Sequence, residues 1–324
     1  MPELPEVETI KRGLEKSVLG QRVLNIEIRN EKIISSHSNI RKPNKVKTES
    51  FIKSLTGKKI IAVKRRAKNI IIEIEDGGII LVHLKMTGQL IYNPHPNPPS
   101  RGGSHSEIQM HLHFSPPLEG GAGGGGCGKH THLIFTLEKG DLLYNDIRQF
   151  GYVLYYKNIE EAIQNKHFEK LGLEPLSNSL NLSIDEVQNL ESFTPVYLKE
   201  KLNKINKNIK STLLAQNIVV GIGNIYADEI CFASNISPHR ICKTLNDIEI
   251  NLLYKNIKNI LSKAIERGGS SVSDYKLVNG ESGRYHLEHK VYGRAGKECY
   301  NCKTILTKDI IMGRSSVWCE VCQK

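Results

Sequence analysis

Met-Pro-Glu-Leu-Pro-Glu-Val-Glu, residues 1–8, is the stretch around which this chain is organised. If Met1 is removed, Pro2 supplies a secondary α-amine, which titrates at about 8 and is therefore partly unprotonated at neutral pH. Pro5 suits the first turn of a helix. Apolar residues then recur at helical spacing before Gly20, at Val7, Ile10, Leu14 and Val18. The stretch therefore predicts a helix that begins beside a free amine.

The chemistry available to such an amine is specific. The partial positive charge of a helix N-terminus lowers the pKa of a nearby amine. A secondary amine that attacks a sugar aldehyde carbon gives an iminium, which cannot neutralise itself by losing an N–H proton and so remains an electron sink. Glu3 and Glu6 are close enough in sequence to move protons there. The same glutamates also suit a first turn in which they only complement the helix dipole, so this stretch alone leaves both interpretations open.

Composition narrows the class of partner. The chain has 324 residues, with 45 Lys and Arg against 34 Asp and Glu, a net charge of +11. This length suffices for two domains, and the basic excess indicates a polyanionic partner, whether DNA, RNA or anionic lipid. The sequence contains no apolar run long enough to span a bilayer, and its charged N-terminus is not a signal peptide. We therefore expect a cytoplasmic protein with reduced thiols.

The first half of the chain, residues 1–157, alternates apolar and polar residues after the first helix, as in Leu24–Arg29. Turn signals at 76–78 and 138–141 separate further apolar runs, which predicts hairpins and an antiparallel β-sandwich. Residues 94–128 interrupt this half with six of the 12 prolines and nine of the 27 glycines. That composition predicts a flexible insertion between strands, dispensable for folding.

Residues 158–288 read as helical. Thr194-Pro195 begins one helix, a lysine-rich stretch covers 201–210, and a capping box at Asn246 opens a long helix that ends at Gly268-Gly269. Between them lies Gly221-Ile-Gly-Asn-Ile-Tyr226, whose glycines would let backbone N–H groups approach a phosphate.

Four cysteines near the C-terminus, in residues 289–324, carry the strongest chemical signal. Two Cys-x2-Cys pairs are separated by 16 residues, at Cys299, Cys302, Cys319 and Cys322. This is zinc-ribbon spacing, and four thiolates close a tetrahedral Zn²⁺ site with no open position. We expect one structural zinc ion, because so short a piece has too little apolar surface to fold without it.

Taken in order, these stretches resemble the bacterial formamidopyrimidine-DNA glycosylases, whose N-terminal proline is a nucleophile. The resemblance rests on residues 1–8, on His83–Met86 and Asp146–Gly151, on Gly221–Tyr226, and on the zinc ribbon. It covers nearly the whole chain outside 94–128. It implies an α+β multidomain fold: an N-terminal β-sandwich (1–157) with an N-terminal helix, a helix-two-turn-helix domain (158–288) and a zinc-ribbon finger (289–324).

The resemblance also implies roles for individual residues. Pro2 would attack C1′ of an oxidised purine nucleotide, Glu3 would move protons at the sugar, and Glu6 would orient the amine. Met86, Arg148 and Phe150 would fill the gap that an extruded base leaves in the stack. Lys68 and Arg314 would support the departure of the leaving phosphates. Further contacts with DNA would come from His130, Lys204, Lys210 and Asn224.

The implied protein is a monomeric, nucleoid-associated enzyme that acts on duplex DNA containing oxidised bases. Two departures from the family concern DNA contacts: Gln149 stands where a basic residue is usual, and Ser273 where Lys or Arg is frequent. A related group, the endonuclease VIII enzymes, prefers oxidised pyrimidines, but usually has glycine in place of Leu4. A third interpretation, a non-enzymatic zinc-ribbon DNA-binding protein, would have no need of Pro2 and is distinguished by the mature N-terminus.

Overall fold

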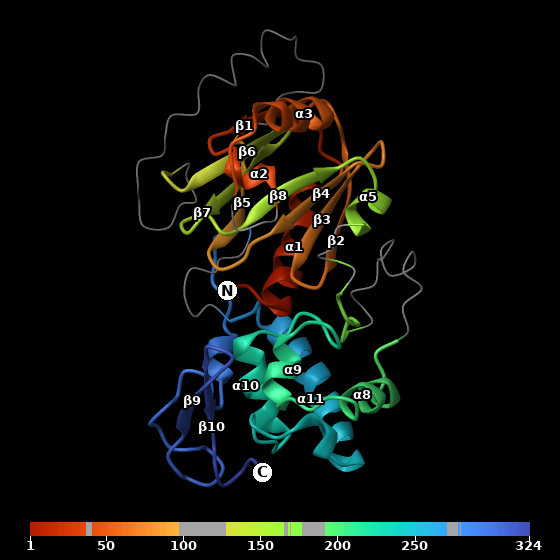
Figure 1. Cartoon of the computed structure of the whole chain (residues 1–324). Helices are drawn as coiled ribbons and strands as arrows, with labels where there is room; N and C mark the ends of the chain where they lie inside the picture. Colours follow the sequence, from red (N-terminus) through yellow and green to blue (C-terminus); the bar gives the residue numbers. More distant parts are fainter. Residues whose placement is uncertain are drawn as a thin grey trace.

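The first half of the chain folds into two four-stranded antiparallel sheets that face each other (Figure 1). The computed structural model describes residues 1–36, 41–96, 128–164, 168, 170–176, 192–270, 278 and 280–324. One sheet has the order β1-β6-β7-β5, from Val23–Ile28, Thr131–Leu137, Gly140–Asp146 and Gly88–Pro94. The other has the order β2-β3-β4-β8, from Ile60–Arg66, Asn69–Ile74, Ile79–His83 and Tyr152–Tyr156. The predicted sandwich is thus confirmed.

The core of the sandwich includes the N-terminal helix. Helix α1 (Leu4–Val18) buries the apolar stripe predicted from its 3.6-residue period, and these residues share one cluster with the inner faces of both sheets. Helices α2 (Lys32–Ser35) and α3 (Lys45–Leu55) contribute to this core, whereas α5 (Ile159–Ile163) packs on the outer face of the second sheet. Candidate site residues lie in two turns of the sandwich. One turn joins β4 to β5, before Gly88, and the other joins β7 to β8, after Asp146.

The second half is helical. It contains α8 (Pro195–Leu202), α9 (Ile209–Leu214), α10 (Asn224–Ala233) and α11 (Asp247–Glu266), with 3-10 turns at Cys242–Thr244 and Tyr285–Glu288. The predicted caps are present: the Thr194 side chain accepts from the amide of Tyr197, and Asn246 and Glu249 cap α11 reciprocally. The chain after α11 turns through positive φ at Gly268 and Gly269, which ends the helix as predicted.

A two-stranded hairpin follows, formed by β9 (Thr307–Ile311) and β10 (Arg314–Trp318). Its small core contains Leu306 and Val317, and it packs against Phe232 of α10 and against Val291. Figure 1 shows the hairpin beside α10, at the side of the helical half. Arg314 therefore leaves the hairpin turn close to the first residues of α10.

The N-terminus lies where the two halves meet (Figure 1). Leu4 belongs to the core of the helical half, whereas Val7 and the later apolar residues of α1 belong to the sandwich core. The amide of Leu4 donates to the carbonyl of Gly221 at 2.9 Å. Gly221 has φ +87°, and a Cβ there would lie 2.4 Å from Leu4, so this close approach requires glycine.

Some predictions concern residues outside the described ranges. Most of the 94–128 insertion (97–127) and Ser273 lie there, so the expectations for them stay predictions. The bounds of the three domains likewise stay predictions. Among the described residues, no helix has the length and apolar character needed to cross a membrane.

Candidate active site and nucleic-acid interface

Pro2 and Glu3 are buried at the junction of the two halves. The Glu3 carboxylate accepts hydrogen bonds from three amides at the start of α10: Gly223 at 2.7 Å, Ile225 at 3.0 Å and Tyr226 at 3.4 Å. A helix N-terminus stabilises a carboxylate in this way because its first N–H groups have no partner within the helix. A Cβ on Gly223 would lie 2.3 Å from the carboxyl carbon of Glu3, so a side chain there would displace it.

Glu6 fixes the backbone of Glu3. Its carboxylate accepts from the Glu3 amide at 2.8 Å, from the Tyr226 hydroxyl at 2.6 Å and from the Ser270 amide at 2.6 Å. Burial, with a further contribution from the charge of Glu3, raises the pKa of Glu6 to about 6. Glu6 thus holds the peptide group that follows Pro2.

Lys68 is close to this centre. It lies in the turn between β2 and β3, and its Nζ donates to the carbonyl of Ile222 at 2.9 Å. Burial lowers the pKa of Lys68 to about 8; the charge of Arg314 also lowers this pKa, while the charges of Glu3 and Glu6 raise it. Lys68 is thus within electrostatic reach of Glu3, Glu6 and Arg314.

A buried charged network, which the sequence analysis did not identify, supports the turn that carries Lys68. Ala67 has φ +55°, outside the usual region for a residue with a side chain. Its amide donates to Glu174 at 2.6 Å, and its carbonyl accepts from Arg65 at 3.0 Å. Arg65 also pairs with Glu8 and with Glu174, each at 2.9 Å. Glu174 lies more than 100 residues from this turn, so no local pattern could have identified it.

Met86, Arg148 and Phe150 meet in an exposed cluster, called here the wedge. Arg148 donates to the sulfur of Met86 at 3.1 Å, and its guanidinium lies 4.7 Å from the ring centroid of Phe150. Met86 is 40% exposed and Phe150 50% exposed, unusual for large apolar side chains. Two separate turns contribute these residues, the first between β4 and β5 and the second between β7 and β8. The structure thus brings these three residues together, and their role at an extruded base stays a prediction.

Asp146 holds these two turns together, a role that the sequence analysis did not assign to it. The carboxylate is fully buried and accepts from the amides of Arg148 at 3.2 Å and Gly151 at 2.7 Å. It also accepts from the hydroxyl of Thr87, the residue after Met86. Arg41 donates to the carbonyls of residues 149 and 151. The two turns that carry the wedge are therefore held in place by hydrogen bonds from Asp146 and Arg41.

The remaining predicted DNA contacts divide into two groups. His130 is half-buried before β6, Lys204 is exposed after α8, and the Asn224 side-chain amide donates to the carbonyl of Ser315 at 2.9 Å. Lys210, in contrast, is completely buried and pairs with Asp228 at 2.6 Å. The structure thus places Lys210 in the interior, where its ammonium faces a carboxylate and not the surface on which a phosphate would bind.

The four predicted metal ligands form one group. The Sγ atoms of Cys299, Cys302, Cys319 and Cys322 all lie within 4.8 Å of one another. The Cys299–Cys322 distance is 3.9 Å and the Cys302–Cys319 distance 3.4 Å, far beyond a disulfide bond of about 2.05 Å. A tetrahedron of sulfurs around a metal at about 2.3 Å has edges of about 3.8 Å. The thiolates therefore fit a closed, four-coordinate metal ion.

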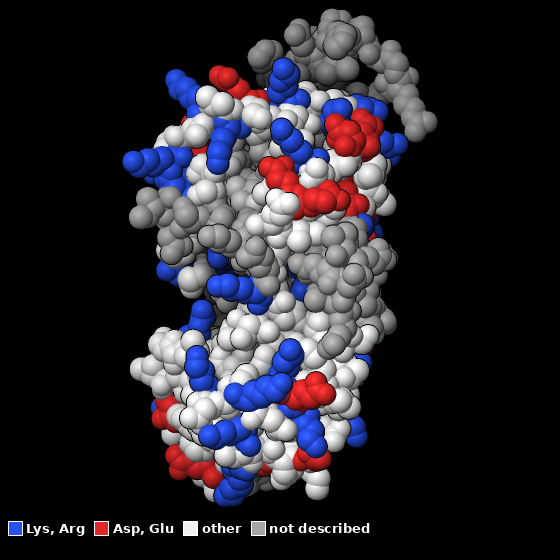
Figure 2. All heavy atoms as spheres, turned by 45° about the vertical axis from the view of Figure 1, so that its right-hand side comes forward, with Lys and Arg blue, Asp and Glu red and all other residues white. Residues whose placement is uncertain are grey.

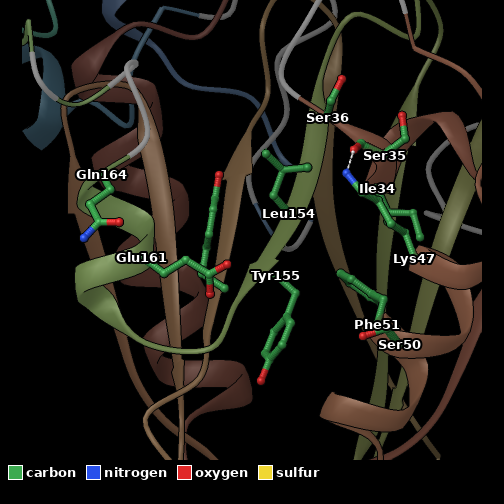
Figure 3. Close-up of a pocket in the computed structure, with 11 residues that line it drawn as sticks. Ile34, Ser35, Ser36, Lys47, Ser50, Phe51, Leu154, Tyr155, Glu161 and Gln164 are labelled. Atoms are coloured by element: carbon green, nitrogen blue, oxygen red, sulfur yellow. Dashed lines mark hydrogen bonds between the residues drawn. The ribbon is translucent and has the colours of Figure 1, made fainter.

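The candidate site lies at the junction of the two halves, where Pro2 and Glu3 are buried. A separate cavity of about 610 Å³ lies between α2, α3, β8 and α5 (Figure 3). Its lining includes Lys47, Phe51 and Leu154 but none of the site residues above. In Figure 2, by contrast, the surface is hollowed between the upper and lower parts, and basic side chains border this indentation. Such a surface suits a large anionic polymer.

Comparisons with known proteins agree with this geometry. The family model of the formamidopyrimidine-DNA glycosylase N-terminal domain matches residues 1–153, and that of the formamidopyrimidine-DNA glycosylase H2TH domain matches residues 171–276. Formamidopyrimidine-DNA glycosylase of Carboxydothermus hydrogenoformans is 36% identical over 324 residues and covers 100% of both chains. The Bacillus subtilis protein of the same name is 34% identical and covers 100% of this chain and 99% of its own.

Solved structures show the same relationship. The Lactococcus lactis Fpg in complex with DNA containing an abasic site aligns with a TM-score of 0.78 at 31% identity, covering 99% of each chain. A complex of the wild-type L. lactis protein with DNA containing N7-benzyl-Fapy-dG aligns equally well, with a TM-score of 0.78 and 100% of both chains covered. The likeness extends over sandwich, helices and hairpin together.

Proposed function

This chain belongs to the formamidopyrimidine-DNA glycosylase family, and we propose that it acts on DNA through the amine of Pro2. It is a base-excision repair enzyme that removes oxidised purines from duplex DNA and cleaves the strand at the resulting abasic site. We propose that it works as a monomer in the cytoplasm, associated with the nucleoid.

One observation carries the assignment of the nucleophile: the carboxylate beside Pro2 is held by the first amides of α10, while Glu6 holds the intervening backbone. A freed N-terminal nitrogen at residue 2 would thus have a defined position beside the Glu3 carboxylate. Preorganisation of this kind is what covalent catalysis requires, since the reacting atoms must be held in a near-attack geometry.

The reaction follows from the chemistry of that amine. The nitrogen of Pro2 bonds to C1′ as the bond from C1′ to the base breaks, and the base leaves with a proton from the site. The attached nitrogen loses its proton, the C1′–O4′ bond breaks as O4′ takes up a proton, and the opened sugar is then an iminium, which acidifies C2′. Loss of the C2′ proton expels the 3′ phosphate, and loss of the C4′ proton then expels the 5′ phosphate. The iminium remains the electron sink throughout because a secondary amine keeps no N–H to lose.

The neighbouring residues divide the remaining tasks. Glu3 moves protons at the sugar, and Glu6 orients the amine through the Glu3 backbone. Lys68, whose pKa of about 8 allows it to give or take a proton, and Arg314 stabilise the departing phosphates. The wedge fills the space vacated by the extruded base, and His130, Lys204 and Asn224 contact the DNA backbone.

The metal bound by the four cysteines is zinc in this proposal. A four-thiolate site with no open position serves structure alone, because catalytic zinc sites keep a ligand position free. The ion would fasten the segments that precede and follow the β9–β10 hairpin, and so secure the base from which Arg314 projects.

Borohydride trapping tests the proposed nucleophile. A duplex containing 8-oxoguanine, mixed with the processed enzyme and borohydride, should give a covalent adduct whose mass spectrum maps to residue 2. The reduced bond would join the proline nitrogen to C1′. An adduct mapped to Lys68 or another lysine would contradict the assignment while leaving the glycosylase activity itself intact.

The pKa of Glu6 predicts a pH dependence of stability. In the folded enzyme it is about 6, above its ordinary value of 4.5, so the folded state binds this proton more tightly. The resulting stabilisation is fully present below pH 4.5 and is lost as the pH rises through 6, about 2 kcal/mol in all. Glu6→Gln should flatten the pH profile of the unfolding free energy between pH 4.5 and 7 by this amount. Glu49→Gln, at an exposed glutamate of α3, serves as control, and equal profiles for both variants would refute the assignment.

Removing the ring of Phe150 should affect base excision more than abasic-site cleavage. The wedge stabilises DNA whose base has been extruded, whereas an abasic site has no base to extrude. Phe150→Ala should slow single-turnover excision of 8-oxoguanine about tenfold, within the 1–3 kcal/mol of a lost stacking contact. Val46→Ala, an exposed apolar residue on α3, is the matched control. Equal slowing of excision and abasic-site cleavage would count against the wedge role.

A further inference from the structure

The residues that follow Arg314 are attached to the helical half by a buried carboxylate. Asp228, on the second turn of α10, accepts from the hydroxyl of Ser316 at 3.0 Å and from the amide of Val317 at 3.1 Å. Its side chain is completely buried, as is that of Lys210, which pairs with it at 2.6 Å. Two consecutive residues of β10 are therefore bound to a single side chain of α10.

Lys210 completes the attachment on the other side of the strand. Its Nζ donates to the carbonyl of Ser315 at 2.9 Å, in addition to its ion pair with Asp228. The same carbonyl accepts from the Asn224 side chain at 2.9 Å. All three residues after Arg314 are thus fixed to α9 and α10, whereas the hairpin turn before it, at residues 312 and 313, is exposed on the surface.

Helix α10 consequently has two functions in one rigid element. Its first amides bind the Glu3 carboxylate, and Asp228, one turn later, binds the strand that begins with Arg314. Figure 1 shows the hairpin alongside this helix. The distance between the N-terminal nitrogen and Arg314 is therefore determined by α10 and by the Asp228–Lys210 pair.

We propose that Asp228 and Lys210 are positioning residues that hold Arg314 in register with Pro2, and that their loss impairs the second elimination selectively. The proposal rests on the roles given above to Pro2 and Arg314. It assigns to Lys210 an indirect role, in place of the phosphate contact expected from the sequence.

The chemistry of the pair favours positioning over simple stabilisation. A buried ion pair is a poor device for stability, because desolvation of both charges offsets much of their attraction, and apolar residues of similar volume often serve as well. Asp228, however, directs its oxygens at a hydroxyl and an amide of successive residues. That arrangement specifies where the strand lies, which an apolar contact does not.

The decisive experiment is a double-mutant cycle between Asp228→Asn and Arg314→Ala, with zinc content checked in each variant. The readout is the ratio of β- to δ-elimination product from a duplex with a preformed abasic site. Asp228→Asn alone should raise this ratio about tenfold, the effect of one lost charge-assisted hydrogen bond. In the Arg314→Ala background it should change the ratio no further, because the group that it positions is absent.

Two further variants keep the test decisive. Lys210→Met with Asp228→Leu replaces the pair by apolar residues, so it should fold and yet show the raised ratio. Asp309→Asn is the control: the Asp309 side chain also bonds within and beyond the hairpin, to Trp318 at 2.7 Å and His239 at 2.8 Å, but it makes none of the side-chain contacts described above to residues 315–317, and the substitution leaves its backbone pairing with Ser316 intact. It should leave the ratio unchanged.

The possible outcomes distinguish the catalytic role proposed for Arg314 from the positioning role proposed for Asp228. If Arg314→Ala leaves the product ratio unchanged, the role given to Arg314 under the proposed function is wrong. If Arg314→Ala raises the ratio but Asp228→Asn multiplies it equally in both backgrounds, Asp228 does not act through Arg314 and the positioning inference is overturned. A normal ratio in the apolar double variant would overturn it as well.

Discussion

A chain that keeps Met1, or that carries any residue before Pro2, is expected to form no borohydride-trapped adduct with DNA and to lose base excision. In such a chain the nitrogen of Pro2 is part of a tertiary amide, whose lone pair is delocalised into the carbonyl and cannot attack C1′. Loss of a covalent nucleophile costs more than about 10³-fold in rate in other enzymes, and a loss of that size is expected here.

A cleavable N-terminal tag provides the matched control, because the same preparation can be assayed before and after the tag is removed to leave Pro2 first. Trapping and single-turnover excision should appear only after cleavage. Pro2→Gly, with a primary amine, should trap more weakly than Pro2, because a primary Schiff base can lose its N–H proton. Full trapping by the uncleaved chain would mean that a lysine is the nucleophile.

Removal of one metal ligand should have the second-largest effect. The cluster around the hairpin contains few buried apolar residues, among them Val291, Leu306 and Val317. Structural zinc contributes an apparent ~10–16 kcal/mol to folding in small zinc domains, far more than so small a core can supply. Cys319→Ser should therefore abolish zinc binding, release Arg314 and weaken DNA binding by more than about tenfold, since the hairpin carries Arg314 and also holds the side chain of Asn224.

Metal analysis and fluorescence anisotropy with a lesion duplex are the appropriate measurements. Cys231→Ala is the control, because it removes a buried thiol of α10 that is not a ligand, and it should retain one zinc per chain. Chelation of the unmodified protein should reproduce the Cys319→Ser result. A stoichiometric zinc content in Cys319→Ser, or unchanged DNA affinity after chelation, would refute the structural role of the metal.

Structural features that depend on residues close together in the chain were predictable from the sequence. The spacing of the four cysteines between Cys299 and Cys322 predicted the metal cluster, and the capping residues Thr194 and Asn246 predicted where two helices begin. Both signals are local, because a Cys-x2-Cys pair and a helix cap each involve residues only a few positions apart. The wedge was predictable only through the family resemblance. Its members come from two turns more than 60 positions apart, and no periodicity relates them.

Contacts between distant residues were not predictable. Lys210 reads as one more lysine in a basic stretch, and only the fold reveals the carboxylate of Asp228 beside it. Glu174 likewise acquires its role from the distant amide of Ala67, and Asp146 joins its own turn to that of Met86 through the distant hydroxyl of Thr87. A charged residue that is solvated in one fold can be buried in another, and sequence alone does not state which partner compensates its desolvation.

The attachment of the N-terminus to residues 221–226 has a consequence for the order of events during synthesis. The first residues leave the ribosome more than 200 residues before Gly221 and Gly223, to which Leu4 and Glu3 bind. At about 5–20 residues per second, roughly 10–45 s separate the two events. Throughout this interval Met1 and Pro2 are accessible to a methionine aminopeptidase. Once the helical half has folded, Pro2 is buried. The N-terminus is therefore most accessible to processing on the nascent chain, before the contacts of Glu3 and Leu4 with the helical half have formed.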